Sequence, residues 1–140
     1  MEPLPENIQE SDPEAVSTEI AYLSCHGDVV TAEIKENADI SVAKMQKLLQ
    51  EAVRIAGFKK YFVIVDARAG FHSEADVRDY YASSEYSKYR YADAFIVKSL
   101  AVRLMVNFYI SVNKPVVPTR TFTDPVQAAR WIHELRQRLN

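Results

Sequence analysis

The sequence predicts an α/β fold in which about five strands form a mixed sheet and about four helices pack on it. Two observations lead to this prediction. Near the start, two segments that alternate apolar and polar residues flank a tight-turn dipeptide, as in an antiparallel β-hairpin. Farther along, helical periodicity alternates with unbroken apolar runs, which is typical of parallel strands covered on both faces.

The chain is expected to hold one domain preceded by a tail. Residues 1–15 contain five acids, three prolines and no base, so they cannot bury enough apolar surface to offset the entropy of ordering. We therefore expect a flexible acidic tail over residues 1–15 and a single domain over residues 16–140. A chain of 140 residues that is 48% hydrophobic is sufficient for one substantial core.

The first predicted element is a hairpin over residues 17–35. Gly27-Asp28 at its centre tolerates the positive φ that a tight turn needs. Cys25 and His26 precede the turn and are adjacent in a strand, so their side chains point to opposite faces. They cannot act together as a nucleophile and its base.

A helix and a central strand follow the hairpin. Apolar residues recur at helical spacing after Ser41, which is placed to cap the helix, and Gly57 supplies a left-handed stop. Residues 60–67, KYFVIVDA, then form an unbroken run that is rich in β-branched residues. Such a run predicts a strand that is buried on both faces.

A second helix and strand repeat this order. Ser73 and Asp76 have the spacing of a capping box, so we expect Ser73 to cap a helix that runs to about Ser84. Residues 92–100, ADAFIVKSL, predict another central strand. Residues 100–112 are apolar almost all round, which predicts a helix buried between the sheet and a second surface, such as another subunit.

The last predicted elements are a short strand and a helix. Residues 118–123, PTRTFT, follow a proline and are polar enough for a sheet edge. Asp124 then stands at an N-cap, Pro125 at the first helical position and Gln127 where a capping box needs it. The final helix therefore begins at this point.

Composition argues against several classes of partner. The net charge of −2 includes the five acids of the tail, and the charge of about +3 on the rest of the chain is too weak for a nucleic-acid-binding protein. No window offers the roughly twenty uncharged apolar residues of a membrane span. The single cysteine cannot form an internal disulfide, and the acidic start of the chain lacks the basic and apolar segments of a secretory signal. Both features favour the cytoplasm.

No arrangement of catalytic or cofactor-binding residues is recognisable. The three histidines fall in the hairpin, a loop and the final helix, and none forms an i, i+4 pair. The three glycines are isolated, which argues against a phosphate-binding loop, and the Gly-x-Ser-x-Gly motif of hydrolases is absent. We expect no enzymatic activity, no metal and no cofactor.

The order of elements, together with the stretches KYFVIVDAR and NKPVVPTRTFTDPVQAARWI, resembles the STAS and SpoIIAA-like (STAS/Sec14-like) superfamily of bacterial anti-sigma-factor antagonists. The resemblance covers residues 19–139 and implies a SpoIIAA-like sheet. In the antagonists, a Phe-x-Asp-Ser-Ser-Gly stretch presents a serine that a partner kinase phosphorylates. Aligning Phe71 with this stretch places Ser73 at the aspartate and Glu74 at the phosphorylated serine, with no glycine after it. The usual phosphorylatable loop is therefore missing.

The carboxyl ends of the parallel strands are the expected place for a partner or a ligand. Polar side chains that should meet there form a candidate rim of Asp66, Arg68, His72, Ser73, Lys98 and Ser99. This mixture of acid, bases and hydroxyls could hold an anion or a loop of a partner protein. It could equally form a rim of internal salt bridges.

Two functions remain open at this stage. The first is a non-enzymatic, regulatory protein-interaction module of the bacterial STAS type. The alternative is a protein that binds a small apolar or lipid-like ligand in a cavity between the sheet and the helices. For either function, the apolar third helix supplies a candidate pocket or dimer face at Leu104, Met105, Phe108 and Tyr109.

Five tyrosines are concentrated between residues 80 and 91, interleaved with Lys88 and Arg90. Aromatic rings beside cations can stack on planar ligands. We expect instead that these rings cover the corner between a helix and a strand, with their hydroxyls in water.

Overall fold

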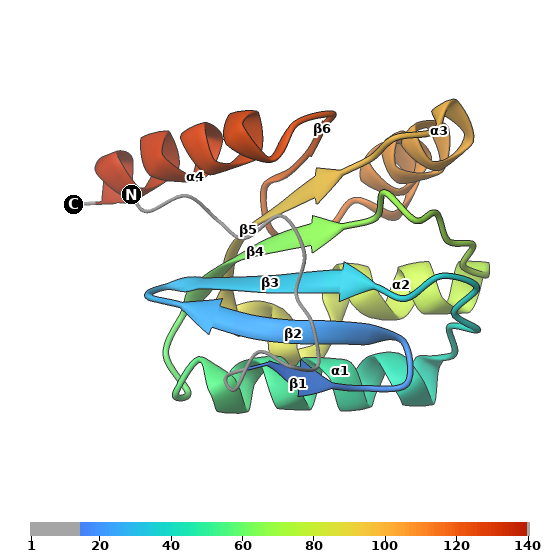
Figure 1. Cartoon of the computed structure of the whole chain (residues 1–140), viewed down its shortest axis with the longest axis horizontal. Coiled ribbons are helices and arrows are strands. Elements are labelled where there is room, and N and C mark those ends of the chain that lie inside the picture. Colours follow the sequence, from blue (N-terminus) through green and yellow to red (C-terminus); the bar gives the residue numbers. More distant parts are fainter. Residues whose placement is uncertain (1–14, 140) are drawn as a thin grey trace.

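A six-stranded mixed sheet organises the molecule (Figure 1). The computed structural model describes residues 15–139, so all but one residue of the predicted acidic tail lies outside the described residues. The strands lie side by side in chain order, and they are β1 (Val16–Ser17), β2 (Ala21–His26), β3 (Val29–Ile34), β4 (Tyr61–Asp66), β5 (Arg90–Ile96) and β6 (Thr119–Phe122). Strands β1 to β3 pair antiparallel and β3 to β6 pair parallel, which confirms the predicted α/β class and the opening hairpin.

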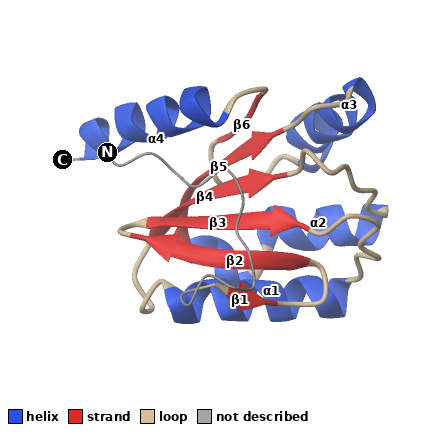
Figure 2. Ribbon diagram, viewed as in Figure 1, coloured by secondary structure: helices blue, strands red, loops and turns tan. Residues whose placement is uncertain are grey.

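Four α-helices cover the two faces of the sheet, and they are α1 (Val42–Ile55), α2 (Ala75–Ser83), α3 (Leu100–Phe108) and α4 (Pro125–Leu139). Apolar residues of α1, α2 and α3 join one core cluster on one face, and those of α4 join a second cluster on the other face. In Figure 2, α4 lies over β5 and β6, away from α1 and α2. A 3₁₀ helix (Glu85–Tyr89) precedes β5, and a π-helical turn (Tyr109–Asn113) extends α3.

The local signals for the hairpin and for α1 are confirmed. Strands β2 and β3 pair from His26 opposite Val29 onward, and Gly27 takes the expected positive φ of 62° in the turn between them. The Ser41 hydroxyl accepts a hydrogen bond from the Lys44 N–H at 3.2 Å. Gly57, at φ 71°, lies just beyond the end of the helix.

Strand β4 is the buried central strand that its composition predicts, since all six residues are buried. Tyr61, Val63 and Val65 face α1, α2 and α3. Phe62 and Ile64 face α4. Both faces of the strand are covered, which explains why the sequence shows no alternation here.

A β-bulge at the start of β5 changes which side chains share a face. Tyr61 pairs with Arg90 but Phe62 pairs with Ala92, so Tyr91 is an extra residue. Without the extra residue, Arg90 and Asp93 would point to opposite faces, because strand side chains alternate. The bulge places both charged side chains on the face that carries α1, α2 and α3.

The predicted cap of α2 is wrong. Glu74 is the N-cap residue and makes no side-chain capping hydrogen bond. The Ser73 side chain is buried instead, and its hydroxyl donates to the Met105 Sδ at 3.8 Å. The loop after β4 turns Ser73 inward toward α3, so the spacing of a capping box is present without its geometry.

The predicted burial of the third helix is confirmed for the face that packs on the sheet, and its burial against a second surface stays a prediction. Helix α3 packs on the sheet through Val102 and Val106, which are buried. On the opposite side, Leu100, Leu104 and Phe108 are 66%, 58% and 51% exposed. The four-residue spacing of these side chains forms one apolar stripe along the helix, which we call the α3 stripe. Nothing within residues 15–139 covers it.

Candidate ligand-binding cavity

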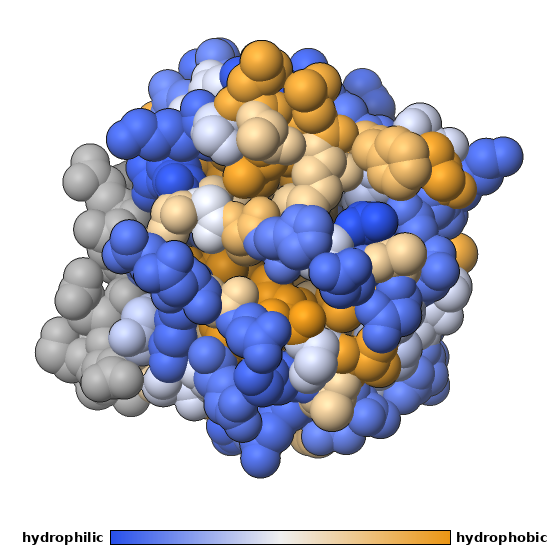
Figure 3. Space-filling view, turned by 90° about the vertical axis from the view of Figure 1, so that its right-hand side faces the viewer, coloured by the Kyte–Doolittle hydropathy of each residue, from blue (hydrophilic) through white to orange (hydrophobic). Residues whose placement is uncertain are grey.

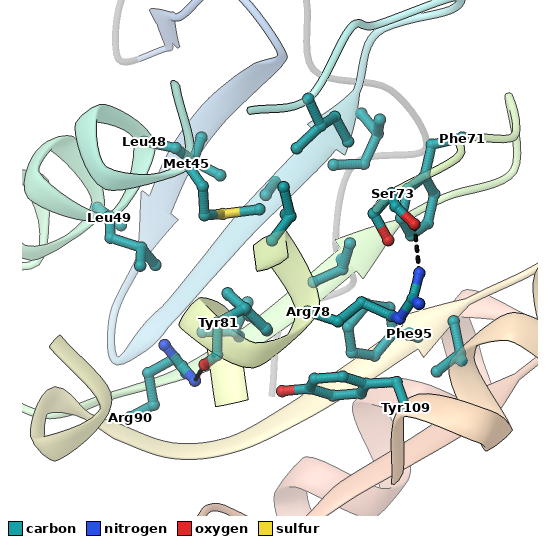
Figure 4. A pocket seen from close by; sticks show the side chains of 18 of the residues that line it. Met45, Leu48, Leu49, Phe71, Ser73, Arg78, Tyr81, Arg90, Phe95 and Tyr109 are labelled. Atoms are coloured by element: carbon teal, nitrogen blue, oxygen red, sulfur yellow. Dashed lines mark hydrogen bonds between the residues drawn. The ribbon is translucent and has the colours of Figure 1, made fainter. Parts of the chain in front are cut away.

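A cavity of about 80 Å³ lies between the sheet and the three helices α1, α2 and α3 (Figure 4). Its walls are the apolar side chains of β2 to β5 below and of the helices above. Well-packed cores contain few voids larger than one water molecule, and a water needs about 10–15 Å³ of such space. The cavity is therefore large enough for roughly six waters or for a small apolar molecule.

The sequence leaves this space because short and long side chains are unevenly distributed around it. Val30, Ala32 and Ala52 line the cavity with side chains of little volume. Aromatic rings, among them Phe71 and Tyr109, stand toward its ends and hold the helices away from the sheet (Figure 4). Both sets read as ordinary core residues in the sequence, so periodicity alone does not reveal a void.

One end of the cavity lies below the loop that follows β4. Arg78 of α2 reaches across this end, and its Nη1 donates a hydrogen bond to the Ser73 carbonyl. The Arg78 guanidinium also lies 5.8 Å from the Phe108 ring centre. Phe71 and Met105 complete the lining. We call this end, formed by Phe71, Ser73, Arg78 and Met105, the mouth. Figure 3 views the side of the molecule toward which the parallel strands point, and apolar surface is visible there in a hollow between polar groups.

The opposite end, which we call the deep end, contains a buried ion pair. The Arg90 Nε lies 3.2 Å from the Asp93 Oδ1, and both side chains are fully buried. The Arg90 Nη2 donates to the Tyr81 carbonyl at 3.0 Å and to the Ser87 hydroxyl at 3.3 Å. The guanidinium also lies over the Tyr81 ring, 4.3 Å from its centre. Tyr61 and Tyr109 add two more hydroxyls to this end.

Burial determines the protonation of the deep end. It raises the pKa of the Asp93 carboxyl, and the Arg90 guanidinium and the Tyr81 hydroxyl offset part of this increase. Burial also raises the pKa of the Tyr61, Tyr81 and Tyr109 hydroxyls above the ordinary value. For Arg90, burial acts to lower the pKa, but the Asp93 carboxylate and the side chains of Tyr81, Tyr109 and Tyr61 together outweigh it, and the pKa is raised. At neutral pH the deep end thus holds three neutral hydroxyls and a charge-balanced pair.

The structure does not assemble the predicted rim into one site. Asp66 accepts two hydrogen bonds from the Arg68 side chain, at 2.9 and 2.7 Å, so this pair forms the internal salt bridge that was the alternative. His72 is exposed and lies 3.2 Å from the Glu74 carboxylate. Lys98 is exposed, and the Ser99 hydroxyl caps α3 by accepting from the Val102 N–H. Of the six rim residues, only Ser73 lines the cavity.

The four predicted residues of the third helix divide into two pairs. Met105 and Tyr109 line the cavity. Leu104 and Phe108 belong to the α3 stripe and point away from it. The pocket expected from sequence is thus present, but only one face of the helix contributes to it.

Sequence reasoning missed the charged residues of the cavity. Asp93 carried a usable signal, since an acid in the middle of a strand that is otherwise apolar needs a buried partner. Arg90 was grouped with the tyrosines, whose hydroxyls were expected in water. That expectation is wrong for Tyr81, which is buried, and for Tyr80, whose hydroxyl is buried.

Residues 15–139 show neither a metal site nor a membrane-spanning helix. Within residues 15–139, no group of three His, Cys, Asp or Glu side chains could hold a metal ion. In the same part of the chain, no helix has the length and hydropathy needed to cross a membrane.

Comparison with known proteins gives one match. The sequence model of DUF7793, described as a domain of unknown function, matches residues 23–136. No curated protein and no solved structure matches the chain. The match spans the hairpin, the parallel strands and most of α4, and the chain therefore belongs to the DUF7793 family.

Proposed function

We propose that this protein binds a small apolar or lipid-like molecule, without catalysis, in the cavity between the sheet and helices α1 to α3. The observation that carries the proposal is the cavity itself. Its long walls are apolar and its few polar groups are concentrated at the two ends, which is the usual arrangement of a small-molecule site. In the polar rim at the strand ends, by contrast, Asp66 is paired with Arg68 and His72 with the neighbouring Glu74.

The size of the cavity limits the ligand. A molecule of about six non-hydrogen atoms gains at most about 1.5 kcal/mol per atom, so micromolar affinity is the upper limit for the part held inside. A longer apolar chain is accommodated if it continues out through the mouth. There Arg78 offers a cation to whatever group remains outside.

Filling the cavity tests the proposal. Ala52 lines the cavity from α1, and Ala52→Leu adds three carbons there without weakening the helix. Ala43→Leu is the matched control, because Ala43 lies on the same helix and is exposed. The three proteins are incubated with an organic extract of the cells that produce them and analysed by native mass spectrometry. We expect a bound mass of up to a few hundred daltons on the wild type and on Ala43→Leu, and none on Ala52→Leu. A wild type without added mass, or an equal mass on Ala52→Leu, contradicts the proposal.

The α3 stripe favours a second candidate function, a regulatory module that acts through protein contact. Three large apolar side chains in one row are unusual on the surface of a monomer, and a second copy of the chain offers a self-complementary row. Leu104→Glu should dissociate such a dimer. Leu139→Glu is its control, since Leu139 is equally exposed, at 57%, on α4. Light scattering that shows a wild-type monomer at high concentration removes this candidate.

A further inference from the structure

Three hydrogen-bond donors that line the deep end of the cavity make no hydrogen bond within residues 15–139, and the Asp93 carboxylate oxygens, which do not line the cavity, have only the ion pair with Arg90. The Tyr61 hydroxyl, the Tyr109 hydroxyl and the Arg90 Nη1 are buried, and none makes a hydrogen bond with any part of residues 15–139. All three residues line the cavity, and they are only 1%, 5% and 2% exposed. Buried donors without acceptors are rare in folded proteins because each one loses its hydrogen bond to water.

These donors come from separate parts of the fold, and both tyrosine hydroxyls interact electrostatically with Arg90. Tyr61 is the first residue of β4, Arg90 is aimed inward by the bulge of β5, and Tyr109 follows the last turn of α3. Figure 4 shows the Tyr109 ring lying below the cavity with its hydroxyl directed to the side on which Arg90 lies. Each donor thus comes from a different element, and only Arg90 is also held by other contacts, through its Nη2 and Nε.

The charge of the deep end is already balanced. The Asp93 carboxylate lies 3.2 Å from the Arg90 Nε and offsets the guanidinium charge. An anionic group placed beside the three donors would bring a second negative charge close to Asp93, in a buried site of low dielectric constant that screens charges poorly. An uncharged oxygen accepts the same hydrogen bonds without this repulsion.

From these observations we infer that the ligand of the cavity carries an uncharged carbonyl or hydroxyl oxygen, which enters the deep end and accepts hydrogen bonds from Tyr61, Tyr109 and Arg90. The inference rests on the proposed function and identifies its ligand as a neutral, oxygen-bearing apolar molecule. The apolar part of that molecule lies along Val63, Val65 and Phe95 and points toward the mouth.

Three probes of similar shape separate the contribution of an oxygen acceptor to binding from the effect of a negative charge. Cyclopentanone carries the carbonyl oxygen, methylenecyclopentane replaces that oxygen with a CH₂ group, and cyclopentanecarboxylate carries a negative charge. Each is titrated into the full-length, ¹⁵N-labelled protein, and its dissociation constant is taken from the amide shifts of cavity residues. We expect the ketone to bind at least several-fold more tightly than the alkene, since each hydrogen bond is worth about two- to tenfold. We expect the carboxylate to bind most weakly.

Removal of single hydroxyls tests the assignment of the donors. Tyr109→Phe and Tyr61→Phe should each weaken ketone binding by about two- to tenfold and leave alkene binding unchanged. Tyr91→Phe is the matched control, because Tyr91 lies close by in β5 but packs in the core on the α4 face. It should alter neither constant.

The outcomes distinguish the two proposals. Equal binding of ketone and alkene, or an unchanged ketone constant in both Tyr61→Phe and Tyr109→Phe, overturns the inference while the apolar site stands. If the carboxylate binds most tightly, the inference that the ligand is neutral is overturned, and the apolar site again stands. If no probe shifts the cavity residues, the proposed function fails and the inference fails with it.

Discussion

The two faces of the sheet are filled in different ways. On the α4 face, Ala92, Ala94 and Ala128 pack among Phe62 and other large side chains in one apolar cluster. On the opposite face, three helices enclose a cavity of about 80 Å³ and a buried ion pair. Both features reduce stability, the first through lost contacts and the second through desolvation. The α4 face is thus a packed apolar core, and the opposite face contains the cavity of the proposed function.

The buried ion pair should show the largest effect. Asp93→Asn keeps the shape of the side chain but leaves the Arg90 cation buried without its counter-charge, which should cost about 3–5 kcal/mol of unfolding free energy. Chemical denaturation measures this loss. Asp28→Asn is the control, because Asp28 pairs with Arg136 at 2.5 Å near the surface, where the side chains are 38% and 26% exposed. It should cost about 1 kcal/mol or less, and equal costs for the two variants would show that the deep end is hydrated.

Alkaline pH should act on the same end of the cavity. The pKa of Tyr61, Tyr81 and Tyr109 is raised by burial, so the folded state holds these protons more tightly than the unfolded state. Their contribution is therefore complete below pH 10 and is lost as the pH rises, by up to about 4 kcal/mol in total at pH 11. An absorbance titration at about 295 nm should show three of the eight tyrosines ionising only as the protein unfolds. Ionisation of all eight before unfolding would contradict the burial of these hydroxyls.

Substitutions of two adjacent residues of β3 compare the packing of the two faces of the sheet directly. Val29 packs in the α4 core and Val30 lines the cavity, and they are 3% and 1% exposed. Val29→Ala should cost about 2 kcal/mol, because it opens a void in a filled core. Val30→Ala should cost only about 1 kcal/mol, since it removes methyl groups that already border empty space. A larger loss for Val30→Ala would indicate that the cavity collapses in solution.

A substitution at the mouth of the cavity should give the smallest change in unfolding free energy. Arg78→Ala removes one hydrogen bond to the Ser73 carbonyl and should lower the unfolding free energy by about 1 kcal/mol or less. We expect ligand exchange to become several-fold faster, which NMR line shapes of bound cyclopentanone would report. Arg130→Ala, at an exposed position of α4, is the control. Unchanged exchange in Arg78→Ala would place the route of the ligand elsewhere.

Local chemistry made most of the fold predictable. Three local features depend only on residues nearby in the sequence, and the structure contains each at its predicted position. They are the turn at Gly27, the Ser41 cap and the Asp124 N-cap. Ser73 shows the limit of such motifs, because contact with Met105, 32 residues away, overrides its capping role.

The candidate site was less predictable because it depends on relations that a single sequence does not display. The bulge that turns Arg90 toward Asp93 is a matter of register between strands. The cavity depends on a small mismatch in volume among many core residues. The sequence predicts the general location of the cavity, between the sheet and the third helix, and two of its lining residues, Met105 and Tyr109.

Methionine methyl groups provide the most direct test that the cavity holds an apolar ligand. The chain has three methionines, of which Met45 and Met105 line the cavity from α1 and α3. In protein labelled with ¹³C at the methionine methyls, titration with cyclopentanone should shift both of these signals with one common dissociation constant. Methyl signals of Met45 and Met105 that stay unchanged at saturating probe would contradict the account.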